Sequence, residues 1–469
     1  MKIIIVSNRV SYEQKPQAGG LSAAIQNVFK DLDGLWVGWS GEICDEQQRH
    51  QGLAQHIQYH VFSLTPEEYD GYYLSFANEV IWPICHLRPS YLRLFENSYG
   101  TYQRVNERFA REALSVAAPE DLIWVHDYHL LLTGRSLRAL GHKGSIGYFH
   151  HIPIPPLDLV RTIPHHTEIW ASLLDYDLVG LQTSNDLKNI LDYFVSYSQS
   201  FPSLKIIEQS QTHICFQYKN RLIKFAVYPI SIDTAYIESI ATDAMELEEV
   251  KNLQESISNC PLVIGVDRLD YSKGLENKFH AFEKALQLPQ ENGQPILLQI
   301  ANKSRSDIAS YQDLCGNLES LTSKINGDHG NPSYAPIRYV NTAYDHTILT
   351  GFYRLARVGL VTPTKDGMNL VAKEYVAAQD PEDPGVLVLS EFAGAAHEML
   401  EALLVNPFHT YSVAQSIHRA LHMPKLERIQ RHRALMKRLR SHDIQRWHQT
   451  FMADMFAVRQ TLHEPEQVA

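Results

Sequence analysis

Residues 366–370 place an acid, a glycine and an asparagine between an apolar run and a stretch of good helix formers. The apolar run at residues 358–361 predicts a buried strand, and the residues from Leu370 onward predict a helix. The first N–H groups of such a helix suit a phosphate, because they lack internal partners and carry the positive end of the helix dipole. Asp366 is placed to accept hydrogen bonds from sugar hydroxyls, and Glu374 to accept hydrogen bonds from both hydroxyls of a ribose. An ordinary loop with surface acids is the alternative.

A second loop carries two basic residues after the apolar run at residues 262–266. Arg268 and Lys273 flank this loop, which ends where a helix is predicted to start. Open α/β sheets bind their ligands at the carboxyl ends of strands. The planar fork of an arginine and the point charge of a lysine together suit a diphosphate. By spacing alone, an exposed loop with two unrelated basic residues is the alternative.

Further candidates lie at other predicted strand ends. Arg9 ends the first predicted strand and Arg305 follows a strand of the second half, so the two would clamp a phosphate if they faced each other. The Gly19-Gly20 turn allows close approach of the backbone to a phosphate or sugar, although a plain turn is the simpler explanation. Tyr73 and Trp82 offer flat faces for a sugar ring, with core packing as the alternative.

Histidines cluster at residues 126–129 and 150–151, which suggests a metal site at first sight. Neighbouring residues on a strand alternate faces, however, and no H-E-x-x-H pattern is present. The acid pair at Asp175 and Asp177 precedes a strand instead of ending one. We therefore expect no metal and no cofactor. The sequence also contains no nucleophile elbow and no P-loop, so phosphate-binding and hydroxyl-binding groups at strand ends remain the main signal.

Composition limits the class of protein. The chain has 469 residues, of which 44% are hydrophobic and 20% charged, as in a folded protein of two domains. Its net charge of −11 argues against nucleic acid or an anionic membrane as partner. Five scattered cysteines fit reduced thiols in a cytoplasmic protein. No apolar run is long enough to span a membrane.

Short apolar runs alternate with amphipathic stretches along the chain, which predicts two α/β domains with mostly parallel sheets. We expect domains at 1–230 and 231–440, then a C-terminal helix at 441–469 that packs back on the first domain, with Ser441 as its N-cap and a disordered tail. Leu275, Phe279, Phe282 and Leu286 form one helical stripe. The predicted strands are residues 2–8, 35–40, 60–64, 122–126, 146–150, 178–183, 262–266, 296–301, 337–341, 358–361 and 386–389.

Seven segments together resemble the trehalose-6-phosphate synthases of glycosyltransferase family 20. These segments are residues 7–9, 19–21, 36–41, 126–129, 268–274, 366–379 and 389–395. The resemblance runs from about residue 1 to residue 455, with the motifs in family order. It implies a GT-B fold, in which two Rossmann-like domains with parallel sheets face an interdomain cleft. It also implies a role in trehalose biosynthesis, and osmoprotection as the setting.

The resemblance implies specific roles for the candidate residues. His151, Arg268, Lys273 and Asp366 would be catalytic, with His151 beside the donor glucose. UDP-glucose would be bound by Gly20, Arg268, Lys273, Tyr344, Asp366, Gly367, Met368, Asn369, Leu370 and Glu374. Glucose 6-phosphate would be bound by Arg9, Tyr73, Trp82, Asp127 and Arg305. Transfer would retain the anomeric configuration, with the leaving phosphate deprotonating the acceptor hydroxyl, so no enzyme nucleophile is expected.

The family resemblance leaves three points open. A related enzyme that uses glycerol 3-phosphate as acceptor, a glucosylglycerol-phosphate synthase, would need less of the Tyr73 and Trp82 platform. A non-catalytic sugar-phosphate sensor would need no donor site, so Arg268, Lys273 and Asp366 together argue against it. Tyr344 stands where the family commonly has Phe, which leaves the choice among UDP, GDP and ADP open. The sequence does not decide between a monomer and a homo-oligomer.

Overall fold

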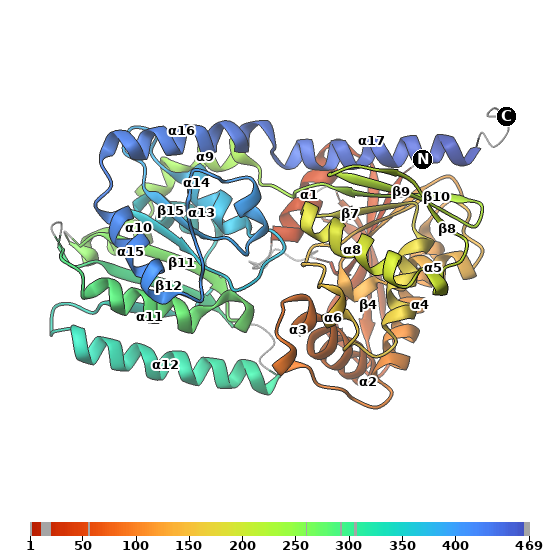
Figure 1. Cartoon of the computed structure of the whole chain (residues 1–469), viewed down its shortest axis with the longest axis horizontal. Coiled ribbons are helices and arrows are strands. Elements are labelled where there is room, and N and C mark those ends of the chain that lie inside the picture. Colours follow the sequence, from red (N-terminus) through yellow and green to blue (C-terminus); the bar gives the residue numbers. More distant parts are fainter. Residues whose placement is uncertain are drawn as a thin grey trace. The chain divides into compact units, whose positions relative to one another are not determined.

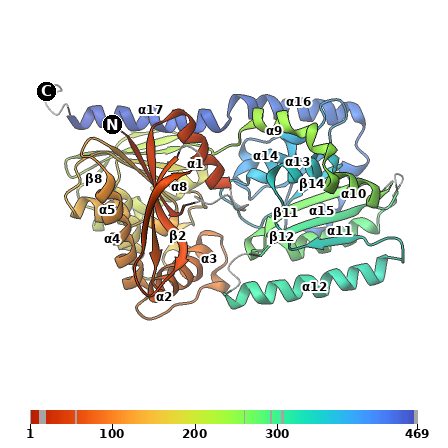
Figure 2. The same ribbon diagram turned by 180° about the vertical axis from the view of Figure 1, so that it is seen from behind.

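The computed structural model describes residues 2–10, 20–54, 57–258, 260–290, 293–303 and 307–463. The chain divides into two compact units. Unit 1 comprises Met1–Ile230 and Gln445–Ala469, and unit 2 comprises Ser231–Ile444. Each unit is a sheet with helices on both faces (Figures 1 and 2). The prediction of two α/β domains built on parallel sheets is therefore confirmed. None of the described helices is both long and apolar enough to cross a membrane.

The sheet of unit 1 has, within the described residues, the strand order β3-β4-β2-β1-β5-β6-β7-β10-β9-β8. Its central strands from β4 to β10 are parallel, and β3, β9 and β8 at the two edges are antiparallel to their neighbours. The strands are β1 (Ile3–Arg9), β2 (Gly34–Ile43), β3 (Arg49–Ala54), β4 (Ile57–Leu64), β5 (Leu122–His126), β6 (Ile146–Phe149), β7 (Leu178–Leu181), β8 (Leu204–Gln209), β9 (His213–Tyr218) and β10 (Arg221–Val227).

The helices of unit 1 cover both faces of this sheet (Figure 1). Helices α4 and α8 contact the sheet on one face, and α5 packs on α4. Helices α1 and α17 contact the other face through Phe29 and Phe451. The helices are α1 (Gly20–Asp31), α2 (Pro66–Glu68), the π-helical segment η1 (Tyr69–Ile81), α3 (Trp82–Cys85), α4 (Ser98–Val116), α5 (Thr133–Ala139), α6 (Leu157–Val160), α7 (His166–Ala171), α8 (Ser184–Ser196) and α17 (Ile444–His463).

Helix α17 docks on unit 1 through an apolar stripe. Trp447, Phe451 and Met455 recur at helical spacing and are all buried, while Ile444, the first residue of the helix, belongs to unit 2. Two glycines of the sheet make room for this stripe. A Cβ on Gly147 would lie 2.8 Å from the sulfur of Met455, and a Cβ on Gly180 would lie 2.9 Å from the Phe451 ring. The C-terminal helix is therefore part of the core of unit 1.

Unit 2 is a six-stranded parallel sheet in its described residues, with the order β13-β12-β11-β14-β15-β16. Helices α11 and α15 pack together, with α12 beside α11, while α13 packs with α9, α10 and α14. The strands are β11 (Leu262–Arg268), β12 (Ile296–Asn302), β13 (Ile337–Val340), β14 (Val358–Val361), β15 (Val386–Ser390) and β16 (Leu403–Val405). The helices are α9 (Thr234–Ala241), α10 (Glu248–Ile257), α11 (Leu275–Leu286), α12 (Ala309–His329), α13 (His346–Leu355), α14 (Leu370–Ala378), α15 (Thr410–Leu421) and α16 (Lys425–Ser441).

Three local predictions were wrong. Ser441 is not a helix N-cap but the last residue of α16, where its hydroxyl donates to the carbonyl of Arg438. The strand predicted at residues 178–183 ends at Leu181, because Thr183 caps α8 by accepting from the N–H of Asp186. Strands β3, β8, β9, β10 and β16 were missed altogether. The first two lie at an edge of their sheet with mostly exposed side chains, so they lack the apolar run that marks a buried strand.

A buried carboxylate ties the β3–β4 edge to α4. Glu112 accepts hydrogen bonds from Arg49 at 2.8 Å and from His60 at 2.9 Å. Burial alone would raise the pKa of Glu112, but the hydrogen bonds from His60 and Arg49 and their charges lower it to about 2. A depressed pKa stabilises the fold above the unfolded value near 4.5, and this stabilisation is lost as the pH falls from there toward 2.

We therefore expect Glu112→Gln to lower the free energy of unfolding at pH 7 by roughly 2–3 kcal/mol. The difference between wild type and variant should shrink as the pH falls below about 4.5. Urea unfolding of both proteins at pH 7, 5 and 3.5 measures this difference. A difference that stays constant over this range would show that Glu112 acts through packing and not through its charge.

Candidate functional site

The loop from Asp366 to Asn369 joins β14 to α14 and is fixed by backbone hydrogen bonds to the loop after β15. The Asp366 N–H donates to the carbonyl of Phe392 at 3.2 Å, and the Asp366 carbonyl accepts from Gly394 at 3.2 Å. The Met368 carbonyl accepts from Ala395 at 2.9 Å. The two loops pack so closely that a Cβ on Gly394 would meet the carbonyl oxygen of Gly367. The loop is therefore rigid and held by main-chain groups.

Asn369 turns this loop into helix α14, which begins at Leu370 as predicted. It has a φ of 89°, a left-handed conformation that asparagine tolerates better than most residues. Its side-chain oxygen accepts from the N–H of Ala372 at 3.2 Å, and its amide donates to Asp366 at 3.0 Å. One side chain thus caps the helix and orients the Asp366 carboxylate.

Lys273 contacts the same Asp366 oxygen that accepts from Asn369. Its Nζ lies 2.5 Å from Oδ2 of Asp366, and the two side chains are only 11% and 14% exposed. Lys273 ends the short 3₁₀ helix η7 (Tyr271–Lys273), and Gly274 after it has a φ of 65°. The N–H of Thr364 donates to the carbonyl of Ser272 at 2.8 Å, which joins the two loops. The structure therefore brings together two residues that the sequence placed only near separate strand ends.

Arg268 and Glu374 lie on β11 and α14, the two elements of unit 2 next to the loops that carry this Lys273–Asp366 pair. Arg268 is the half-buried last residue of β11, and Glu374 lies on α14. The Glu374 carboxylate is 3.5 Å from Nε2 of His346, a residue that the sequence analysis did not single out. The hydrogen bond with Glu374 raises the pKa of His346, against the effect of burial. Tyr344 packs edge-on against Phe352, with ring centroids 5.2 Å apart.

On unit 1, the carboxyl ends of β1, β5 and β6 carry the other candidates. Arg9 ends β1 and is exposed, with its guanidinium carbon 5.8 Å from the centroid of the Trp39 ring. Tyr73 lies in η1 and stacks on His129 at 5.7 Å with an interplanar angle of 8°. Trp82 is only 3% exposed and stacks on His86 at 3.9 Å. The structure thus places Trp82 in the core of unit 1 and leaves Tyr73 partly accessible.

Asp127 follows β5 in a strained conformation, with φ 74° and ψ 166°. Its N–H donates to the carbonyl of Phe149 at 2.8 Å, and its Oδ1 accepts from the N–H of His151 at 3.2 Å. The His151 ring in turn contacts His126, with Nε2 and Nδ1 3.0 Å apart. Burial lowers the pKa of His126 to about 3 and that of His151 well below its usual range, so both rings are neutral at pH 7.

The remaining predicted residues lie on both units. Gly20 is the first residue of α1, Gly367 and Met368 are buried, and Leu370 opens α14. Arg305 lies outside the described residues. Within the part of the chain that the structure describes, no cluster of three or more His, Cys, Asp or Glu side chains is arranged to hold a metal ion.

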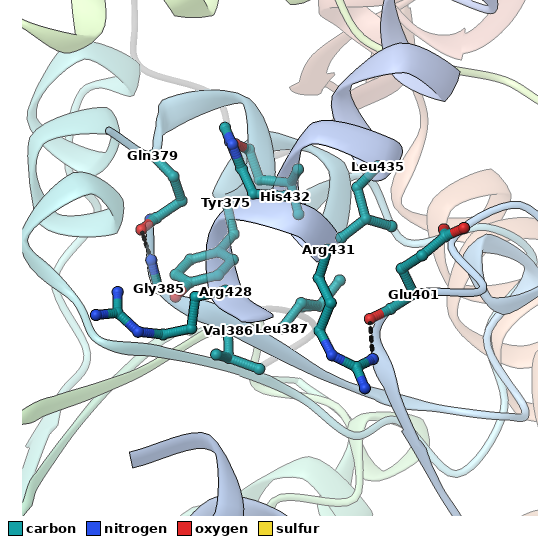
Figure 3. A pocket seen from close by; sticks show the side chains of 11 residues that line it. Tyr375, Gln379, Gly385, Val386, Leu387, Glu401, Arg428, Arg431, His432 and Leu435 are labelled. Atoms are coloured by element: carbon teal, nitrogen blue, oxygen red, sulfur yellow. Dashed lines mark hydrogen bonds between the residues drawn. The ribbon is translucent and has the colours of Figure 1, made fainter. Parts of the chain in front are cut away.

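A pocket elsewhere on unit 2 lies between α14, β15 and α16 (Figure 3). Its two arginines are already engaged with the protein. Arg428 donates to the carbonyl of Met423 and to Asp383, and Arg431 donates to the carbonyl of Glu401. None of the residues predicted to bind a ligand lines this pocket, so it is separate from the candidate site. The lining residues are Tyr375, Val376, Gln379, Gly385, Val386, Leu387, Glu401, Arg428, Arg431, His432 and Leu435.

Comparison with known proteins identifies the family. The model of glycosyltransferase family 20 matches residues 2–457. The chain belongs to this family. It is 42% identical over 465 residues to a trehalose-6-phosphate synthase of Sinorhizobium fredii, covering 97% of this chain and 98% of that one. It is 40% identical over 460 residues to a trehalose-6-phosphate synthase of an Enterobacter species, covering 97% and 95%.

Solved structures of the family show the same fold. An α,α-trehalose-phosphate synthase (UDP-forming) from Burkholderia xenovorans, in complex with glucose 6-phosphate, matches with a TM-score of 0.93 and 38% identity, over 97% of this chain and all of that one. The Escherichia coli protein bound to UDP-2-fluoroglucose matches with a TM-score of 0.90 and 38% identity, over 97% and 99%. These similarities confirm the predicted GT-B fold class of this family 20 chain.

Proposed function

We propose that this family 20 chain transfers glucose from UDP-glucose to glucose 6-phosphate with retention, forming trehalose 6-phosphate and UDP. The observation that carries the proposal is the Lys273–Asp366 pair, held beside the N-terminus of α14 at the carboxyl edge of the unit 2 sheet. This is the position at which parallel sheets bind nucleotides. The similar proteins whose structures hold a UDP-glucose analogue and glucose 6-phosphate support both substrates.

Unit 2 would hold the donor. Arg268 and Lys273 would neutralise the diphosphate, and Glu374 would accept from the ribose hydroxyls. Asp366 and the loop N–H groups as far as Leu370 would bind the glucose ring, and Gly20 of unit 1 would also contact the donor. Because the backbone of this loop is fixed, its N–H groups need no rearrangement when UDP-glucose binds. Such preorganisation is the condition for strong electrostatic stabilisation.

Unit 1 would hold the acceptor. Arg9 would bind the phosphate together with Arg305, while Tyr73, Trp82 and Asp127 would contact the sugar. Asp127 is suited to this role because its strained backbone turns its carboxylate toward the N–H of His151 at the end of the sheet. Trp82 is buried, so we expect it to support the acceptor pocket mainly by packing under Tyr128, 5.5 Å away.

The chemistry would need no nucleophile from the protein. The bond between the anomeric carbon of the donor glucose and the β-phosphate oxygen breaks, and the anomeric hydroxyl of glucose 6-phosphate attacks from the same face. The proton of that hydroxyl passes to the leaving phosphate. Arg268 and Lys273 stabilise the negative charge that grows on the diphosphate. His151, neutral at pH 7, would contact the donor glucose at the reacting centre.

Release of nucleoside diphosphate from UDP-glucose tests the proposal, with glucose 6-phosphate and glycerol 3-phosphate offered separately. We expect release with glucose 6-phosphate and formation of a phosphorylated 1,1-linked disaccharide that retains both α configurations. Release only with glycerol 3-phosphate would overturn the acceptor and keep the donor assignment. No release with either acceptor, from UDP-, GDP- or ADP-glucose, would overturn the enzyme assignment and favour a sugar-phosphate sensor.

A further inference from the structure

His126 ends β5 and lies beside the site without facing solvent. Its side chain is fully buried, and β5 pairs with β6 so that His126 lies opposite Phe149. The chain leaves β6 at Phe149 and reaches His151 two residues later, which brings the His151 ring back over His126. The rings are 5.3 Å apart with an interplanar angle of 24°, and Nδ1 of His126 is 3.0 Å from Nε2 of His151.

The wall behind this histidine pair is aromatic. The Trp124 ring lies 4.5 Å from the His126 ring, and the Trp447 ring of α17 lies 5.4 Å from Trp124. Phe149 lies 4.6 Å from the His151 ring. These side chains leave His126 little freedom to rotate, because it is packed on several sides by rigid rings. The position of Nδ1 is therefore set by the core of unit 1.

We propose that His126 is a positioning residue for His151, and that it donates the hydrogen bond from its Nδ1–H. This inference rests on the proposed function, because it assumes that His151 contacts the donor glucose. Because Nε2 of His151 accepts this hydrogen bond from His126, the His151 ring contacts the donor glucose through its Nδ1 edge. It then carries its own proton on Nδ1 and acts there as a hydrogen-bond donor to a sugar oxygen.

The surroundings of His126 favour this direction of the hydrogen bond. Nε2 of His126 is buried and has no hydrogen-bond partner among the described residues, and the same holds for the indole nitrogens of Trp124 and Trp447. Both indoles are donors only, so this part of the core is short of acceptors. A proton on Nε2 of His126 would add a third unmatched donor, whereas a lone pair there adds the acceptor that this part of the core lacks. The proton of His126 therefore belongs on Nδ1.

Two consecutive residues at the end of β5 hold His151 in place. Asp127 holds its backbone N–H and His126 holds its ring. Side chains that touch a substrate lose much of their effect when they are misplaced by about 1 Å, which costs on the order of 100-fold in rate. Removing His126 should therefore lower kcat while the protein stays folded.

The test compares two neighbouring buried histidines. His126→Leu should lower kcat about 100-fold, with a smaller change in the KM for UDP-glucose. The amide of His126→Asn can donate from near the Nδ1 position. This variant should therefore have a kcat at least about ten-fold higher than that of His126→Leu. His150→Leu is the control, because His150 is equally buried but its Nδ1 contacts Tyr148 at 2.8 Å and not His151. Because this substitution changes the packing but not the hydrogen bond to His151, it should keep kcat within about three-fold of wild type.

A spectroscopic measurement on the wild type gives a readout independent of folding in the variants. In ¹⁵N-histidine-labelled protein, His126 and His151 should both appear as neutral Nδ1–H tautomers. The His151 signals are assigned with His151→Ala and those of His126 with His126→Asn. A proton on Nε2 of His151, or a His126→Leu loss no larger than that of His150→Leu, would overturn the proposal. If wild type transfers no glucose at all, the proposed function fails, while the tautomers still show whether the histidine pair is ordered as inferred.

Discussion

Arg268→Ala should lower kcat for glucose transfer by about 1000-fold while leaving the thermal unfolding temperature nearly unchanged. Arg268 ends β11 at the carboxyl edge of the sheet, and in the proposed function its guanidinium binds the diphosphate. The negative charge on that group increases as the glycosidic bond breaks, so a cation there stabilises the transition state more than the ground state. The side chain is half-buried and packs at a strand end, so its loss should cost little stability.

Two further variants separate charge from geometry in this prediction. Arg268→Lys keeps the charge but loses the planar fork, so it should fall between wild type and Arg268→Ala. Arg419→Ala removes the same side chain from an exposed position of α15, where the guanidinium pairs with Glu427, and should leave kcat unchanged. Steady-state assays measure kcat of all three variants, and thermal melts show whether each one is folded. Wild-type turnover in folded Arg268→Ala would remove Arg268 from the donor site.

Periodicity predicted those parts of the fold that are buried on a regular pattern. The stripe Leu275, Phe279, Phe282 and Leu286 lies on the buried face of α11, and the α17 stripe is equally buried. Apolar runs predicted the central strands other than β10 for the same reason. The edge strand β3 has only one partly buried residue, Ala54, and its pairing with β4 comes from the tertiary fold. A pattern of burial cannot predict a strand that is not buried.

The candidate site was predicted in parts, because sequence marks strand ends but not how they meet. Lys273 and Asp366 are 93 positions apart, and only the parallel pairing of β11 with β14 brings their loops together. His346 was missed because no motif distinguishes it. His126 was weighed as part of a metal pattern and lies in one of the family segments, but it was given no role in the site, because its contact with His151 depends on the register of β5 against β6.

Gly394→Ala should have the largest structural effect on the donor half of the site. A Cβ at this position would lie far inside the contact distance of the Gly367 carbonyl oxygen and 3.0 Å from the Cα of Met368. These obstacles are backbone atoms, so no side chain can rotate away. The loop at residues 366–369 would have to move, and Gly394 donates to Asp366 from the same place. Overpacking of this kind costs about 1–3 kcal/mol or more of stability.

Because the displaced loop carries Asp366 and the cap of α14, activity should suffer more than stability. We expect kcat/KM for UDP-glucose to fall at least about 100-fold, since a shift of about 1 Å in a positioning element has that effect. Gly316→Ala is the matched control, because a Cβ there meets nothing within 4 Å. It lies inside α12 and should stabilise the protein by about 0.5–1 kcal/mol with unchanged kinetics. Equal kinetics for the two variants would show that the packing of Gly394 on Gly367 does not set the position of the donor loop.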